Sequence, residues 1–162
     1  MWTLGALTLA GAGAVLLASA EAPRDATPAA VTEALAMEPG VVKVWKSPTC
    51  GCCGGWVDHM REAGFEVEVV DTQDLRPIKA EHGVTDDLAS CHTAVVDGYV
   101  VEGHVPAADI RRLLAERPDI AGIAAPGMPT GSPGMEVPGR PADAYDVVAF
   151  TRDGGRTVFA SH

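Results

Sequence analysis

Three cysteines stand within four residues at the point where a short predicted strand is followed by a predicted helix. The segment Cys50-Gly51-Cys52-Cys53 follows the β-branched run 41–45 and leads into residues 52–63, where apolar side chains recur at helical spacing. The unpaired amides and the dipole of such a helix start favour the thiolate form of Cys50, which makes a Cys-x-x-Cys pair with Cys53. A thiolate is the nucleophile of disulfide exchange and also a ligand for soft metals. The cluster therefore points to thiol or soft-metal chemistry at a βα turn.

The remaining pattern predicts an α/β chain with a thioredoxin-like order of elements. The predicted elements are strand 41–45, helix 52–63, strand 65–70, helix 74–82, hairpin 93–101 and helix 106–116. In this order the Cys-x-x-Cys pair lies where thioredoxin-like proteins keep theirs. We therefore expect a thioredoxin-like core over residues 41–118.

Residues 119–162 form a predicted C-terminal extension of this core. Proline and glycine are dense from Ile120 to Arg140, and Pro-Gly-Met occurs twice, ending at Met128 and at Met135. The chain then predicts a second β-hairpin, 145–151 with 156–160, around an Asp-Gly-Gly turn.

The first twenty residues read as a secretory signal peptide. They carry no charged side chain, they include an apolar run, and they end in Ala18-Ser19-Ala20, the small-x-small pattern of a cleavage site. The alternative is an N-terminal anchor that is not cleaved. Residues 21–40 then form a tether or a leading helix. We expect a periplasmic or otherwise extracytoplasmic protein, without stable membrane insertion once the signal is removed.

The charge balance bears on the partners. The 162 residues include 22 acidic and 12 basic side chains, for a formal net charge of −10. Nothing in the chain could neutralise a row of phosphates, which argues against a nucleic-acid partner. Hydrophobic residues make up 47% of the chain and charged residues 21%, an ordinary balance for a globular protein.

The fourth cysteine, Cys91, precedes the predicted third strand and is followed by His92. In thioredoxin-like folds this loop faces the Cys-x-x-Cys turn, so Cys91 is expected to meet Cys50, Cys52 and Cys53. Clustered soft ligands in an extracytoplasmic protein favour Cu(I). Two alternatives stay open, which are a tetrahedral zinc site and a pair of structural disulfides, although adjacent cysteines pair poorly with each other.

The weaker ligand candidates are His92, Met128 and Met135. A thioether is a soft ligand, so the duplicated Pro-Gly-Met could form a lid or a secondary copper contact. The alternative is that both methionines pack as apolar plugs over the core. Of the two histidines near the hairpin, His92 and His104, we expect His92 to have the better claim to the site.

The chain resembles the CopG-like periplasmic copper-resistance family, also described as domain of unknown function 411. The stretches that carry the resemblance are 46–53 with Trp56, 90–99, 102–106, 126–129 and 132–136. The resemblance implies a thioredoxin-like fold, copper binding by the clustered cysteines and a role in changing copper between its two oxidation states. Ordinary thioredoxin relatives carry a cis-proline before the third strand, where this chain has Cys91-His92-Thr93. That difference favours a metal over generic disulfide exchange.

Two functions follow from these residues. The first is an extracytoplasmic protein of copper homeostasis or resistance that binds Cu(I), as a small multinuclear thiolate cluster, through Cys50, Cys52, Cys53 and Cys91. Oxidation of Cys50 with Cys53, or of Cys52 with Cys91, would supply electrons to Cu(II), and other periplasmic copper carriers would be partners. The second is a thiol–disulfide oxidoreductase that acts on proteins through Cys50 and Cys53. A third option is a passive copper store without redox turnover, which the sequence does not separate from the first function.

Overall fold

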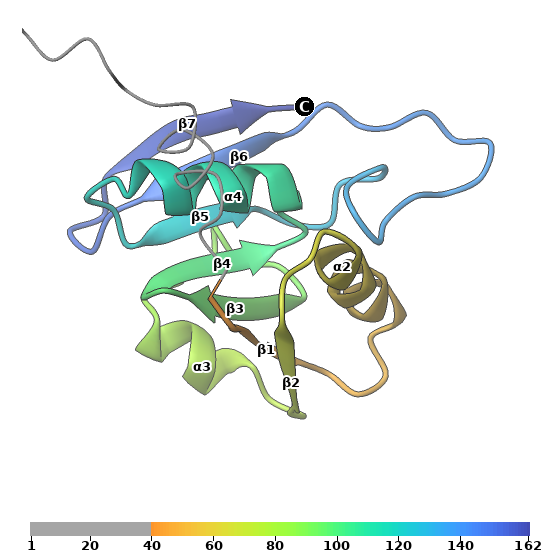
Figure 1. Cartoon of the computed structure of the whole chain (residues 1–162), viewed down its shortest axis with the longest axis horizontal. Helices are drawn as coiled ribbons and strands as arrows, with labels where there is room; N and C mark the ends of the chain where they lie inside the picture. Colours follow the sequence, from red (N-terminus) through yellow and green to blue (C-terminus); the bar gives the residue numbers. More distant parts are fainter. Residues whose placement is uncertain (1–39) are drawn as a thin grey trace, which may run out of the picture. The chain divides into compact units, whose positions relative to one another are not determined.

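A computed structural model of the protein describes residues 40–162, and these residues build one mixed sheet of seven strands with three helices (Figure 1). The predicted signal peptide, 1–20, and all of the predicted tether except Gly40 lie outside the described residues. The elements in chain order are β1 (Val42–Lys46), α2 (Gly51–Glu62), β2 (Val67–Asp71), α3 (Arg76–Glu81), β3 (His92–Val96), β4 (Tyr99–Gly103), α4 (Ala107–Glu116), β5 (Gly122–Ala125), β6 (Asp146–Phe150) and β7 (Arg156–Ser161).

The strands lie in the order β2-β1-β3-β4-β5-β6-β7. β1 pairs with β2 in parallel and with β3 in antiparallel, so the crossover through α2 returns the chain to the same sheet. β3 and β4 are antiparallel, β5 is parallel to β4, and β6 and β7 continue the sheet in antiparallel. The mixed α/β class predicted from the sequence is therefore confirmed.

The main core lies between the sheet and the helices α2 and α4. Trp56 and Met60 of α2 and Ile110 and Leu113 of α4 are fully buried against alternate residues of the strands, such as Val44. The helix faces are apolar at intervals of three and four residues, which is why the spacing predicts them correctly. This packing against the sheet fixes the position of α2, and with it the position of its first turn over the end of the sheet.

A smaller core covers the opposite face of the sheet. It includes Val84 and Leu88, from the loop after α3, packed against Val100 and Phe150. Lys79 of α3 also reaches this face. Apolar contacts therefore hold the loop between α3 and β3 against this face of the sheet.

The sequence did not predict β5. This four-residue strand, Gly-Ile-Ala-Ala, begins the segment that is dense in proline and glycine, and three of its residues are small, so no strand pattern marks it. Its residues are fully or almost fully buried between β4 and β6, because they complete the sheet there. Within residues 40–162 no helix is both long enough and apolar enough to span a membrane.

Candidate metal centre

The first turn of α2 presents the cysteine cluster. Cys50 is the N-cap residue in an extended conformation, and its carbonyl accepts the amide of Gly54 at 3.3 Å to open the helix. The preceding turn is closed by the Cys50 amide, which donates to Ser47 O at 3.1 Å. No acidic side chain stands in the first turn, so the helix dipole acts on the cysteines without local opposition.

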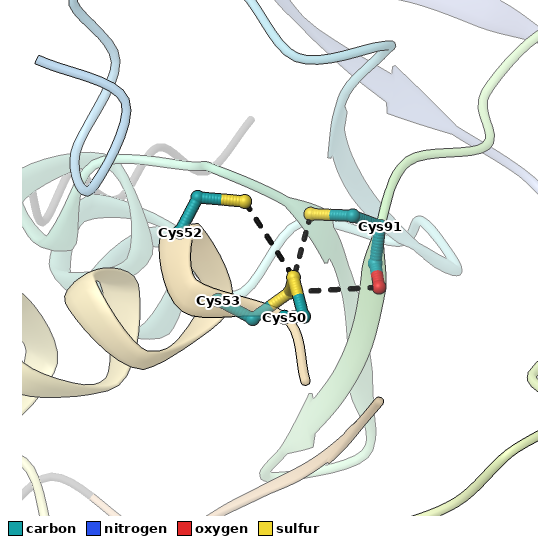
Figure 2. Close-up of side chains that lie close together, drawn as sticks. All are labelled: Cys50, Cys52, Cys53 and Cys91. Carbon is teal, nitrogen blue, oxygen red and sulfur yellow. Dashed lines mark hydrogen bonds between the residues drawn. A yellow bond between two sulfur atoms is a disulfide. The ribbon is translucent and has the colours of Figure 1, made fainter. Parts of the chain in front are cut away.

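Four sulfur atoms meet at this turn (Figure 2). Cys50 and Cys53 form a disulfide, whereas Cys52 and Cys91 are free thiols. Cys52 Sγ lies 3.5 Å from Cys50 Sγ, and Cys91 Sγ lies 3.4 Å from Cys53 Sγ. All four sulfurs are within 4.8 Å of one another, so one soft ion or a small thiolate-bridged cluster could contact them all once the disulfide is reduced.

Two imidazoles also lie close to Cys91 Sγ. His104 Nε2 is 3.0 Å from Cys91 Sγ, and His92 Nδ1 is 3.4 Å from it. The three ligand atoms lie within 4.8 Å of one another. Cys91 therefore belongs both to the four-sulfur group and to a sulfur–imidazole group, and it joins them into one candidate metal centre.

The tautomer of His104 follows from its second contact. His104 Nδ1 lies 2.8 Å from Pro133 O, and a carbonyl can only accept, so Nδ1 carries the proton. In the neutral ring the lone pair of Nε2 then faces Cys91. This is the arrangement of metal-binding histidines, whose other ring nitrogen donates to a carbonyl or carboxylate.

His92 is packed under the site by the indole of Trp56, with ring centroids 4.5 Å apart. Trp56 is itself fixed by its Nε1–H, which donates to Val105 O at 2.9 Å. His92 is fully buried, and its Nε2 is the one buried side-chain nitrogen or oxygen in residues 40–162 without a hydrogen-bond partner. A buried polar atom without a hydrogen-bond partner destabilises the folded protein. The position of the His92 ring is therefore better explained by a role of Nδ1, which lies near Cys91, than by a contribution to stability.

Burial sets the protonation of these groups. It raises the pKa of the Cys91 thiol to about 12, with a further contribution from the nearby Cys52. Burial also lowers the pKa of His92 well below its ordinary value, helped by His104, and lowers the pKa of His104. Both imidazoles are therefore neutral at pH 7 and keep a lone pair for a metal, while Cys91 must lose its proton to a metal that replaces it.

This protonation predicts how the stability of the metal-free protein changes with pH. Below about pH 6.5, the ordinary pKa of histidine, the unfolded chain takes up protons at His92 and His104 that the folded chain does not. The free energy of unfolding should therefore fall as the pH drops below that value, as measured by urea denaturation at a series of pH values.

A His104→Gln variant should show a shallower dependence on pH. The difference between the two slopes separates His104 from Glu102, whose pKa is raised by burial and which acts in the opposite direction. Equal slopes in the two proteins would contradict the prediction.

The segment between β5 and β6 reaches back to the start of α2 (Figure 1). Gly134 has a φ of +81°, and a Cβ there would lie 2.6 Å from both Cys52 O and Trp56 N. Gly55 of the helix faces Gly134 so closely that its own Cβ would lie 3.0 Å from Gly134 Cα. Two glycines thus let the C-terminal segment contact the cysteine turn, and this contact also places Pro133 O against His104.

Only some of the predicted site residues meet at the cysteine cluster. It brings together Cys50, Cys52, Cys53, Cys91 and His92. Met128 is 55% exposed, whereas Met135 is half-buried next to Gly134.

His104, which the sequence ranks below His92, has the shorter contact with Cys91. The pairing of β3 with β4 places the residue after β4 beside the start of β3. The closeness of His104 to Cys91 therefore follows from the hairpin that the sequence predicts.

The fold and the site define a mixed α/β protein in which cysteine sulfurs and two imidazoles lie close enough together to hold a metal ion. Two solved structures, titled copper resistance protein CopG, form 2 and form 1, are each 48% identical to the chain. They match with TM-scores of 0.73 and 0.72, covering 77% of this chain and 99% and 98% of theirs. The chain therefore belongs to the CopG copper resistance family, as its resemblance implies.

A family described as "Protein of unknown function, DUF411" also matches residues 88–135, which include Cys91, both imidazoles and both Pro-Gly-Met segments. No curated protein matches the chain.

Proposed function

We propose that the protein binds Cu(I) through Cys50, Cys52, Cys53 and Cys91, and that it works outside the cytoplasm in copper homeostasis. The observation that carries the proposal is the meeting of four sulfurs and two neutral imidazoles at one turn. Sulfur and imidazole ligands favour copper, whereas sites for hard cations are built mainly from carboxylates and other oxygen ligands. The relatives titled copper resistance protein support copper over zinc, and a thioredoxin-like core would place the cluster at the same turn that such proteins use.

The disulfide between Cys50 and Cys53 suggests how the site would exchange electrons with copper. In the reduced protein, two thiols would give up two electrons to two Cu(II) ions. One sulfur–sulfur bond would form, two protons would leave, and two Cu(I) ions would result. Cys52 and Cys91, which remain thiols beside the disulfide, would keep soft ligands next to the ions produced. Oxidation of Cys52 with Cys91 is a second source of two electrons.

The test is an anaerobic Cu(I) titration of the reduced protein against a tight competing chelator, followed by addition of Cu(II) to the metal-free reduced protein. Tight binding, and the appearance of one disulfide for every two Cu(II) ions reduced, are the expected results. Failure to compete for Cu(I) would overturn the binding proposal. Tight binding without reduction of Cu(II) would leave a passive copper store in place of the redox function.

A thiol–disulfide oxidoreductase is the second candidate, favoured by the Cys50–Cys53 pair at the start of α2. Against it stands Cys91, whose Sγ lies 3.4 Å from Cys53 Sγ, at the position where ordinary thioredoxin relatives carry a cis-proline that helps to bind a substrate polypeptide.

A Cys52→Ser variant separates the two functions. An oxidoreductase should keep a near wild-type rate on a model disulfide substrate, because Cys52 lies outside its redox pair. A copper centre should lose affinity for Cu(I), because one of its four sulfurs is gone. Loss of Cu(I) affinity together with negligible disulfide exchange in both proteins is the expected result, and a fast exchange rate in both would favour the oxidoreductase.

A further inference from the structure

A buried ion pair lies on the face of the sheet away from α2, beneath the loop that carries Cys91. Glu102 of β4 is fully buried, and its carboxylate pairs with Lys79 Nζ of α3. Thr93 Oγ1 donates to Glu102 Oε2 at 2.7 Å and accepts from Lys79 at 3.1 Å. The Ser90 amide donates to Glu102 Oε1 at 2.6 Å, so one carboxylate accepts three hydrogen bonds from three segments.

This pair differs from the other ion pairs in residues 40–162, each of which has a partner that is at least 33% exposed. Glu102 and Lys79 are 0% and 15% exposed at their side chains. Burying two charges is expensive, and apolar residues of similar volume often stabilise a protein as well or better. Stability alone therefore explains this pair poorly, whereas its hydrogen bonds connect it to the residues around Cys91.

Those hydrogen bonds hold both sides of Cys91. The Ser90 amide stands directly before Cys91, and Thr93 follows two residues after it. Glu102 lies on β4, two residues before His104, which directly follows that strand. The carboxylate therefore ties together the loop that carries Cys91 and the two strand ends that carry His92 and His104.

The Ser90 side chain extends the connection to the C-terminal segment. Its hydroxyl donates to Gly127 O, while the Gly127 amide donates to Ala89 O at 3.0 Å. A shift of Ser90 would therefore move Cys91 Sγ relative to Cys53 and His104, from which it lies 3.4 and 3.0 Å away.

We propose that Glu102 is a positioning residue for the metal centre, which sets the place of Cys91 Sγ by accepting the Ser90 and Thr93 hydrogen bonds while Lys79 balances its charge. The consequence for copper rests on the proposed function, but the placement of Cys91 does not. Partners that orient metal ligands typically change metal affinity by about 10–100-fold when they are removed.

The test compares two ways of replacing the carboxylate. The double variant Lys79→Met/Glu102→Leu removes both charges, so no buried charge is left unpaired, but it deprives the Ser90 amide of its acceptor. Glu102→Gln keeps an oxygen toward Ser90, and its amide group can donate to Thr93. Glu68→Gln, which removes an exposed ion pair with Lys43, is the matched control.

Three measurements are made on each protein, which are Cu(I) affinity, the ultraviolet charge-transfer bands of the Cu(I)–thiolate complex, and the rate of Cys91 alkylation in the reduced, metal-free chain. The double variant should bind Cu(I) about 10–100-fold more weakly, with altered bands, and Cys91 should be alkylated faster while Cys52 is unchanged. The Cu(I) affinity of Glu102→Gln and of the control should stay within about threefold of wild type. That change is small beside the loss of about 10–100-fold that is typical when the partner of a metal ligand is removed.

The double variant overturns the proposal if it folds and matches wild type in all three measurements. Should it fail to fold, Glu102→Gln decides, because a loss of affinity in that variant contradicts positioning by hydrogen bonds. Absence of Cu(I) binding in wild type would overturn the proposed function, and the alkylation rates of Cys91 would still judge the role of Glu102.

Discussion

Replacing Cys91 with serine is expected to lower the affinity for Cu(I) by more than about 100-fold, more than the loss of an outer ligand partner costs, and to leave the fold intact. Cys91 Sγ is the one atom shared by the four-sulfur group and the sulfur–imidazole group, so its loss separates the two imidazoles from the other sulfurs. Serine keeps the size and the loop geometry, while its hard oxygen is a poor ligand for a soft ion.

The measurement is the competition titration with reduced protein, accompanied by thermal unfolding of the metal-free form. Thr49→Ser is a suitable control, because Thr49 lies on the exposed turn beside Cys50 and contributes no sulfur. An unchanged affinity in Cys91→Ser would remove Cys91 from the site and with it the reason for including His104. A large loss of stability in the metal-free form would instead mean that Cys91 is a structural residue.

The meeting of Cys91 with the first cluster could be predicted because it depends on topology. A strand, a helix and a hairpin can each be recognised from their periodicity, and their order is the one for which thioredoxin-like folds place the loop before the third strand against the cysteine turn. The structure pairs the start of β3 with the end of β1. Sequence patterns carry such information well, because one apolar face decides where each element packs. Hence 38 residues of separation between Cys53 and Cys91 did not hide the contact.

The ranking of the two histidines depends on contacts that leave no pattern in the sequence. His104 is oriented by a backbone carbonyl, that of Pro133, which any residue type could supply. His92 follows Cys91 directly, but its ring packs against Trp56 and approaches Cys91 less closely. Glu102 was likewise visible only as part of a matching stretch, because its three donors come from separate segments.

Replacing Gly134 with alanine is the second change with a large expected effect. The new Cβ would lie 2.6 Å from Cys52 O and from Trp56 N, both backbone atoms of α2 that have little freedom to move. The positive φ of +81° adds strain for any residue with a side chain. We expect the Pro133–Met135 segment to lift from the helix, which takes Pro133 O away from His104 Nδ1 and frees the ring to turn.

The variant should be less stable by about 1–3 kcal/mol, because strain at a left-handed position and a steric clash act together. Cu(I) affinity should fall by about 10–100-fold, the cost of losing an outer partner of a ligating histidine. Urea denaturation and the competition titration measure the two effects separately.

Gly139→Ala is the matched control for this variant. Gly139 has a nearly identical φ of +79°, but a Cβ there meets nothing within 4 Å, so the variant carries the backbone strain without the clash. We expect it to lose some stability and to keep its affinity for Cu(I). If both variants bind copper like wild type, the C-terminal segment contributes nothing to the centre. If both lose affinity equally, backbone strain in the segment is responsible, and the contact between Gly134 and α2 is not. Only a loss confined to Gly134→Ala supports an orientation of His104 that depends on the close approach of two glycines.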